Sequence, residues 1–179
     1  MVALMRCLAL ALALPLAALA QGESRPGEAE IKAAFLYKFG DFVQWPPASL
    51  GRAEAPFAIG VMGAEDVAAA LEQLVANRTV QGRPVVVRRV RAGESLARLH
   101  VLFIGQADAP RLAETLASAR GQPLLTVTDS DNAISQGSMI NFVAEDQRVR
   151  FDIAPASAER GQLKISSRLL AVARRVITS

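Results

Sequence analysis

The sequence predicts an α/β fold, a three-layer α/β/α sandwich with a mixed, mostly parallel sheet and a C-terminal antiparallel hairpin. Short runs that are apolar at nearly every position alternate with longer stretches of helical spacing, as in a sheet covered on both faces. Near the C-terminus, the strand-like runs 139–144 and 148–153 flank the polar turn Glu145-Asp146-Gln147. This arrangement is typical of a hairpin.

The first predicted element is a helix over 28–43. Its apolar residues recur at spacings of four, four and three and form one stripe: Ile31, Phe35, Phe39 and Phe42. Pro46 and Pro47 then end the helical region, because proline lacks an N–H donor and restricts the residue before it. We expect Phe35 to be buried. We expect Trp45 to close the core beneath the Pro46-Pro47 turn, the alternative being that it forms part of a partner-facing patch.

The middle of the chain alternates between predicted strands and helices. Apolar or β-branched runs predict strands over 57–62, 85–90, 100–104 and 124–128. Helical spacing predicts helices over 63–76 and 109–120, the second with Asp108 as its N-cap and Pro110 in its first turn. We expect Phe103 to lie buried in a central strand.

The last part of the chain predicts an edge strand and a closing helix. In the run 148–153 one face is apolar and the other carries charges at alternate positions, which suits an edge that must not aggregate. A final helix is predicted over 166–177, with apolar residues Leu169, Leu170, Val172, Ala173 and Val176.

The first twenty residues predict an export signal. The basic residue Arg6 precedes an Ala/Leu run over 7–19, and Ala18-Leu19-Ala20 offers the small residues that a signal peptidase reads. We expect cleavage between Ala20 and Gln21, a periplasmic mature protein, and no membrane insertion after cleavage.

The mature chain is predicted to comprise a disordered stretch over 21–27 and a single domain over 28–177. Cleavage would remove the only cysteine, Cys7, and with it any disulfide, thiolate nucleophile or Cys-ligated zinc. The whole chain has 20 Lys and Arg against 17 Asp and Glu, and no run of like charges exceeds two residues. We therefore expect no nucleic-acid partner.

Residue patterns of known catalytic centres are absent from the sequence. His100 is the only histidine, opens an apolar strand and has no Cys or second His to act with, so we expect a structural role. The G-x-S-x-G elbow, the G-x-G-x-x-G fingerprint and the phosphate-binding loop do not occur. We assign no catalytic residue, metal ligand or cofactor, and predict that the protein is not an enzyme.

A small-ligand crevice is the one site that the pattern suggests. Gly63, Gly105 and Asp129 each follow an apolar strand, and the carboxyl ends of parallel strands line the ligand crevice of open α/β sheets. Asp131 follows in the same loop and completes the candidate set. The alternative is a loop whose Asp and Asn side chains only cap backbone groups.

Seven segments, taken in order, carry a resemblance to a known family. They are the helix 33–39 running into Trp45-Pro46, and the segments 57–63, 100–104, 125–129, 137–140, 150–153 and 165–170. Over 28–177 the chain resembles the YfiR-like family of periplasmic regulators. Two departures are Ala154, where the family usually has Asn, and the lack of the cysteine pairs found in some members.

The resemblance implies an α/β/α regulator that binds the periplasmic sensor part of an inner-membrane diguanylate cyclase and represses it, lowering cyclic-di-GMP and biofilm output. Such a regulator must bind one state of its partner better than the other. The competing hypothesis is a periplasmic sensor domain that holds a small ligand. The first needs an exposed apolar patch, the second a deep pocket with convergent polar groups. The sequence leaves open whether the protein is a monomer or a homodimer.

Overall fold

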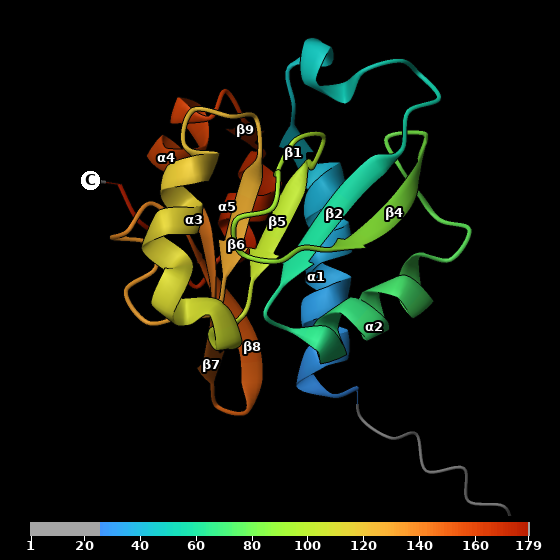
Figure 1. Ribbon diagram of the computed structural model, residues 1–179. Coiled ribbons are helices and arrows are strands. Elements are labelled where there is room, and N and C mark those ends of the chain that lie inside the picture. The colour runs from blue at the N-terminus through green and yellow to red at the C-terminus, as the bar shows by residue number, and fades with distance from the viewer. Residues whose placement is uncertain (1–25, 179) are drawn as a thin grey trace, which may run out of the picture.

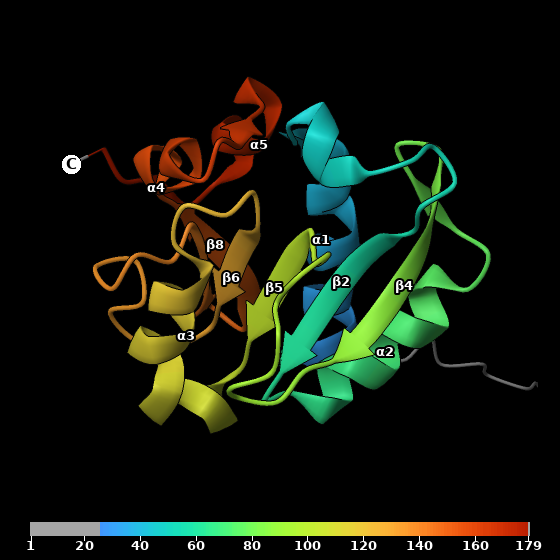
Figure 2. The same cartoon turned by 45° about the horizontal axis from the view of Figure 1, so that its top comes forward.

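The computed structural model describes residues 26–178 (Figure 1). The predicted signal segment 1–20, its cleavage site at Ala20 and Gln21, and most of the stretch 21–27 lie outside the described residues. Within the described part, helices lie on both faces of a mixed, mostly parallel sheet (Figures 1 and 2), which confirms the predicted three-layer α/β/α sandwich.

The described residues form five α-helices and two short 3-10 helices. The α-helices are α1 Glu28–Phe42, α2 Glu65–Val75, α3 Leu112–Ala119, α4 Pro155–Arg160 and α5 Ser167–Val172, and the 3-10 helices are η1 Pro47–Leu50 and η2 Gln106–Arg111. The strands of the main sheet are β2 Phe57–Met62, β3 Thr79–Val80, β4 Arg83–Arg89, β5 Val101–Ile104, β6 Leu125–Thr128, β7 Ile140–Glu145, β8 Arg148–Ile153 and β10 Arg175–Val176. A separate two-stranded sheet pairs β1 Val43–Gln44 with β9 Lys164–Ile165.

The eight-stranded sheet has the order β10-β8-β7-β6-β5-β2-β4-β3. Neighbours are parallel except at β7–β8 and β3–β4, which are antiparallel. The predicted hairpin is therefore confirmed. Its turn has positive φ at Asp146 (49°) and Gln147 (58°), as the right-handed strand twist requires in a two-residue hairpin loop.

Two hydrophobic cores cover the two faces of the sheet. Alternate residues of a strand point to opposite faces, so Ile59 of β2 and Phe103 of β5 pack on the side of α1 and α2. Met62 and Leu102 pack beneath α3 on the other side. Phe103 is fully buried, as predicted.

The buried face of α1 differs from the predicted stripe. Ala33, Leu36, Phe39 and Gly40 are buried, whereas Phe35 is only half-buried, so the prediction that Phe35 is buried is wrong. The reason is that small residues let the helix lie close to the sheet. A Cβ atom at Gly40 would stand only 2.7 Å from a methyl carbon of Val80, so the close approach at this position depends on glycine. Phe35 instead packs against an aromatic group, with ring centroids 5.2–6.0 Å from those of Phe39, Phe142 and Phe151.

Trp45 closes the core, as expected. It is 6% exposed, its ring meets Phe57 edge-on at a centroid distance of 5.1 Å, and its indole N–H donates to the His100 carbonyl oxygen at 3.2 Å. The indole therefore ties the segment after α1 to the beginning of β5.

The helix predicted over 109–120 is divided in two. The 3-10 helix η2 precedes α3, and its N-cap is Gly105, so Asp108 is not a helix N-cap. The Asp108 N–H donates to the Gly105 carbonyl at 3.0 Å, an i to i−3 bond of the tighter helix. Pro110 lies inside η2, where its missing N–H prevents a regular α-helical ladder.

The helix predicted over 166–177 is wrong beyond Val172. Ala173 takes an extended conformation, and Arg175–Val176 join the sheet as β10, parallel to β8. The Arg174 N–H donates to the Phe151 carbonyl at 2.8 Å. Strand β8 is therefore not the sheet edge at its C-terminal end. There its charged residue Asp152 binds arginines of the added segment instead of protecting an open edge.

Candidate functional site

Gly63 and Gly105 lie against each other at the carboxyl ends of β2 and β5. The Gly105 N–H donates to the Met62 carbonyl at 2.8 Å, and a Cβ atom at Gly105 would stand 2.5 Å from the Gly63 carbonyl oxygen. Asp108 of η2 closes over Gly63, whose φ of +65° favours glycine. Both glycines thus allow the two chain segments to pack closely where they pass each other. Gly63 also borders an open hollow of about 680 Å³.

Asp129, at the end of β6, is part of a half-buried ion pair. Its Oδ2 lies 2.7 Å from the Lys32 ammonium of α1, which is also 2.7 Å from Glu28 Oε1. Burial lowers the pKa of Lys32, but the hydrogen bonds to Asp129 and Glu28 outweigh this and hold it above 10.5. Lys32, which the helical pattern did not single out, therefore anchors α1 to the sheet.

Asp131 follows Asp129 in the same loop, and together they border a hollow of about 320 Å³. Gly63 lines a different hollow. The structure therefore groups the four candidate residues into two pairs, Gly63 with Gly105 and Asp129 with Asp131.

The largest ion-pair cluster in the described part of the chain lies where β10 meets β8. Asp152 is 3% exposed, and its carboxylate accepts hydrogen bonds from Arg174 at 2.6 and 2.8 Å and from Arg175 at 3.0 and 3.3 Å. Burial raises the pKa of the Asp152 carboxyl, but these guanidinium groups outweigh it and hold the pKa below 3.8. The cluster fastens the C-terminal strand to the sheet.

Sequence reasoning missed this cluster because its members are more than twenty positions apart. The available signals were the acidic residue among the alternating arginines of the run 148–153 and the Arg174-Arg175 pair. Neither signal says that the two segments pair.

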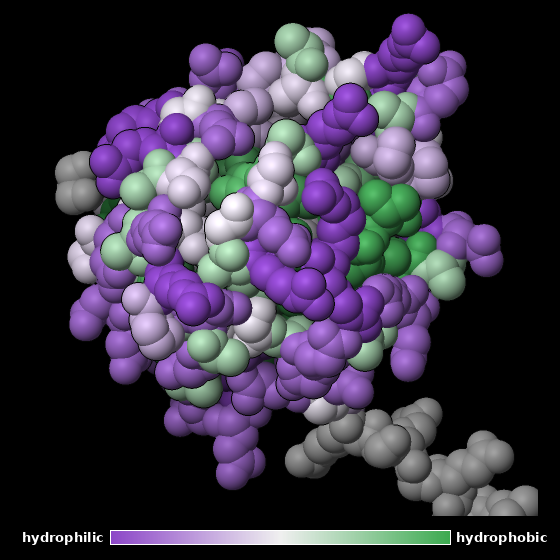
Figure 3. Space-filling view, in the orientation of Figure 1, coloured by the Kyte–Doolittle hydropathy of each residue, from purple (hydrophilic) through white to green (hydrophobic). Residues whose placement is uncertain are grey.

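The segment 167–177, here called the C-terminal segment, combines this anchorage with exposed apolar side chains. Val172 is 60% exposed and Val176 41% exposed, and among large hydrophobic residues in the described part only Val86 is also exposed. Figure 3 shows a mostly hydrophilic face with an apolar patch over β4, where Val86 lies, far along the sheet from the C-terminal segment. β10 also borders a hollow of about 810 Å³, whose lining includes Asn141, Asp152 and Ser157.

His100 has the structural surroundings that the sequence predicted. It is 4% exposed, its ring stacks on Phe57 at a centroid distance of 4.6 Å, and its Nδ1 accepts the Ala58 N–H at 3.0 Å. Burial lowers the pKa of the imidazole below 6.5, and the charge of Arg83 acts in the same direction. Protonation of Nδ1 would cost the bond from Ala58.

We expect His100 to make the protein less stable in mild acid. A histidine whose pKa is lowered by folding binds its proton more readily in the unfolded chain, so its contribution to stability is complete above pH 6.5 and is lost below it. The free energy of unfolding of the wild type should fall relative to that of His100→Gln between pH 7.5 and pH 5, as measured by urea titration. Parallel curves for the two proteins would contradict this prediction.

The described residues contain no helix long and apolar enough to cross a membrane. They also contain no group of three or more His, Cys, Asp or Glu residues placed to hold a metal ion.

Comparison with known proteins shows a family match. The family model DUF4154, described as YfiR/HmsC-like, matches residues 29–174 and so covers every element from α1 to α5. No curated protein matches the chain. The match agrees with the resemblance drawn from the sequence segments and extends over most of the chain. The protein therefore belongs to the YfiR/HmsC-like family, a family of regulators rather than enzymes.

Proposed function

We propose that the protein is a periplasmic repressor that binds the periplasmic sensor part of an inner-membrane diguanylate cyclase and lowers cyclic-di-GMP output. Membership of the YfiR/HmsC-like family carries this proposal, because the family supports regulation of cyclic-di-GMP signalling. The signal pattern in residues 1–20 supports export to the compartment where the sensor part would lie.

The C-terminal segment is the proposed contact surface. Val172 and Val176 expose apolar area that would lose its water on binding, a favourable contribution in most protein–protein associations. The Asp152 cluster holds β10 against β8, so this surface is already ordered before a partner arrives. A preformed surface lowers the conformational cost of binding.

Repression requires that the protein favour the inactive state of the cyclase. To shift a two-state equilibrium from mostly active to mostly inactive, it must bind the inactive state more tightly by a few kcal/mol, up to ~5.5 kcal/mol for a nearly complete shift. Contact alone can supply this difference, without any catalytic side chain.

Deletion of the gene tests the proposal. Cyclic-di-GMP and matrix output should rise in the deletion strain and return to the wild-type level when the exported protein is restored. A form lacking residues 1–20 should not restore repression. Unchanged cyclic-di-GMP after deletion, under conditions in which the protein is expressed, would refute the proposal.

Substitution of the exposed valines tests the contact surface. Val172→Asp should abolish repression in the restored strain while the purified protein keeps its melting temperature, because this side chain is 60% exposed. Val86→Asp is the matched control, since Val86 is exposed at the other end of the sheet. If Val86→Asp relieved repression and Val172→Asp did not, the contact surface would lie over β4 instead.

A periplasmic small-ligand sensor is the second candidate. The hollow of about 810 Å³ beside β10, with buried polar side chains in its lining, favours this function. The loop of Asp129 and Asp131 borders the smaller hollow nearby. Tight binding of a metabolite by the purified protein, removed by Asp129→Ala, would support the sensor function at that loop.

A further inference from the structure

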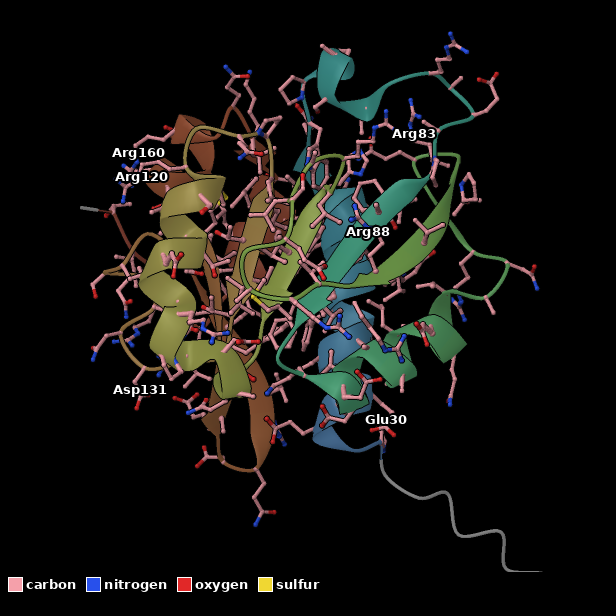
Figure 4. All side chains as sticks on the ribbon, viewed as in Figure 1. Glu30, Arg83, Arg88, Arg120, Asp131 and Arg160 are labelled. Carbon is pink, nitrogen blue, oxygen red and sulfur yellow. The ribbon has the colours of Figure 1, made fainter. Side chains whose placement is uncertain are left out.

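Two arginines from different helices converge on one hollow. Arg120 directly follows α3, and Arg160 is the last residue of α4. Both line a hollow of about 380 Å³ between these helix ends and the loop that precedes β7. In Figure 4 the two labelled side chains lie beside each other on the same flank of the molecule.

The packing of the two helix ends fixes this convergence. A Cβ atom at Gly161 would stand 2.9 Å from the Gln122 carbonyl oxygen and 2.9 Å from the Met139 methyl carbon, so the end of α4 approaches the chain after α3 closely. Arg160 donates from Nη2 to the hydroxyl of the buried Ser157 at 2.9 Å. This bond holds the Arg160 guanidinium at the hollow.

Neither guanidinium has a carboxylate partner among the described residues, whereas Arg89, Arg174 and Arg175 each form ion pairs there. A cation at a helix C-terminus is favourable by itself, which accounts for each arginine alone. That effect does not account for the fact that both arginines line the same hollow.

An oxyanion in the hollow would have two guanidinium groups to accept hydrogen bonds from. A guanidinium has five N–H donors, and only one of those of Arg160 is used by Ser157. Arginine pairs well with carboxylate and phosphate groups because its planar fork matches their oxygen atoms.

The hollow also has room for more than a simple ion. It shares Ser135, Gly137, Ser157 and Arg160 with the hollow of about 810 Å³ beside β10. The larger hollow adds the apolar side chains of Ile134 and Ile177 to its lining. An organic molecule held by its anionic group at Arg160 could therefore extend along β10.

We infer that Arg120 and Arg160 form a binding site for a small oxyanion, either free phosphate or the carboxylate or phosphate group of an organic molecule. The inference rests on these side chains and does not depend on the proposed repressor function. Since the adjoining hollow borders β10, a bound molecule that extends into it would also contact the C-terminal segment.

Titration of the purified protein with inorganic phosphate and, separately, with citrate tests the inference. Sodium chloride keeps the ionic strength constant, and binding is measured by calorimetry and by the shift in melting temperature. At least one of the two anions should bind and raise the melting temperature. Arg160→Gln and Arg120→Gln should each weaken that binding about tenfold or more, as expected for the loss of charge-assisted hydrogen bonds.

Arg98→Gln is the matched control, because Arg98 is an exposed loop arginine that does not line this hollow. It removes the same charge and should leave the dissociation constant within about twofold, since exposed charges at a distance are largely screened. Binding of citrate but not phosphate would assign the site to organic carboxylates, and the reverse to phosphate groups. The inference is overturned if neither anion binds, or if all three variants weaken binding equally.

Discussion

Replacing Phe103 by alanine should lower the free energy of unfolding by about 3–5 kcal/mol, the range for truncating a fully buried aromatic residue. Phe103 is completely buried in β5 and has neighbouring strands on both sides, where it is paired with Val61 and Val127. Its ring meets Phe142 at a centroid distance of 5.9 Å. Because strands on both sides hold the backbone in place, the cavity left by the ring can collapse only in part.

Denaturant titration with circular dichroism measures this loss. Phe35→Ala should cost clearly less, since Phe35 is half-buried on α1. Val86→Ala is the control and should cost below about 1 kcal/mol, because that side chain is partly exposed on β4. A loss of less than about 1 kcal/mol for Phe103→Ala would show that β5 is not a central strand.

Asp152→Asn should cost about 2–3 kcal/mol at neutral pH. The substitution keeps the size of the side chain but removes the charge that two guanidinium groups share. Removing one partner of a buried ion pair costs about 3–5 kcal/mol. Because Arg175 is exposed, we expect the loss for Asp152→Asn to lie at or below the lower end of this range. Glu145→Gln is the control, because Glu145 is a more exposed partner of Arg174 and should contribute less than about 1 kcal/mol.

The effect of Asp152→Asn should also depend on pH. A carboxyl group whose pKa is lowered by folding contributes stability above its ordinary value of 3.8, and this contribution is lost as the pH falls through its lower value in the folded protein. The stability difference between wild type and variant should therefore shrink in strong acid. A constant difference from pH 7 to pH 3 would show that the carboxylate is not paired with the arginines.

Local patterns were sufficient for most of the elements. The run 57–62 forms β2 with the predicted bounds, and the run 148–153 forms β8, because consecutive apolar or alternating residues have few other ways to be buried. α1 begins at the predicted residue. Its buried face did not follow from apolar spacing, since Gly40 and Ala33 decide how closely the helix approaches the sheet.

Two of the errors concern contacts between distant segments. Residues 166–177 have helical spacing, yet Arg175–Val176 form a strand because the edge of β8 and the carboxylate of Asp152 are available there. The candidate crevice is a second example. The sequence showed that Gly63, Gly105 and Asp129 end strands, but it did not show which of these residues lie close together in the fold.

Residue types and short spacings were enough to predict the fold class, the six longer strands in their order along the chain and the resemblance to a regulator family. Three further features followed only from the folded chain: the pairing of β10 with β8, the Lys32–Asp129 ion pair and the convergence of Arg120 with Arg160. The physical reason is the same for all three. A charged side chain takes its place from the partners that folding brings within a few ångströms, and the local sequence does not specify which segments those are.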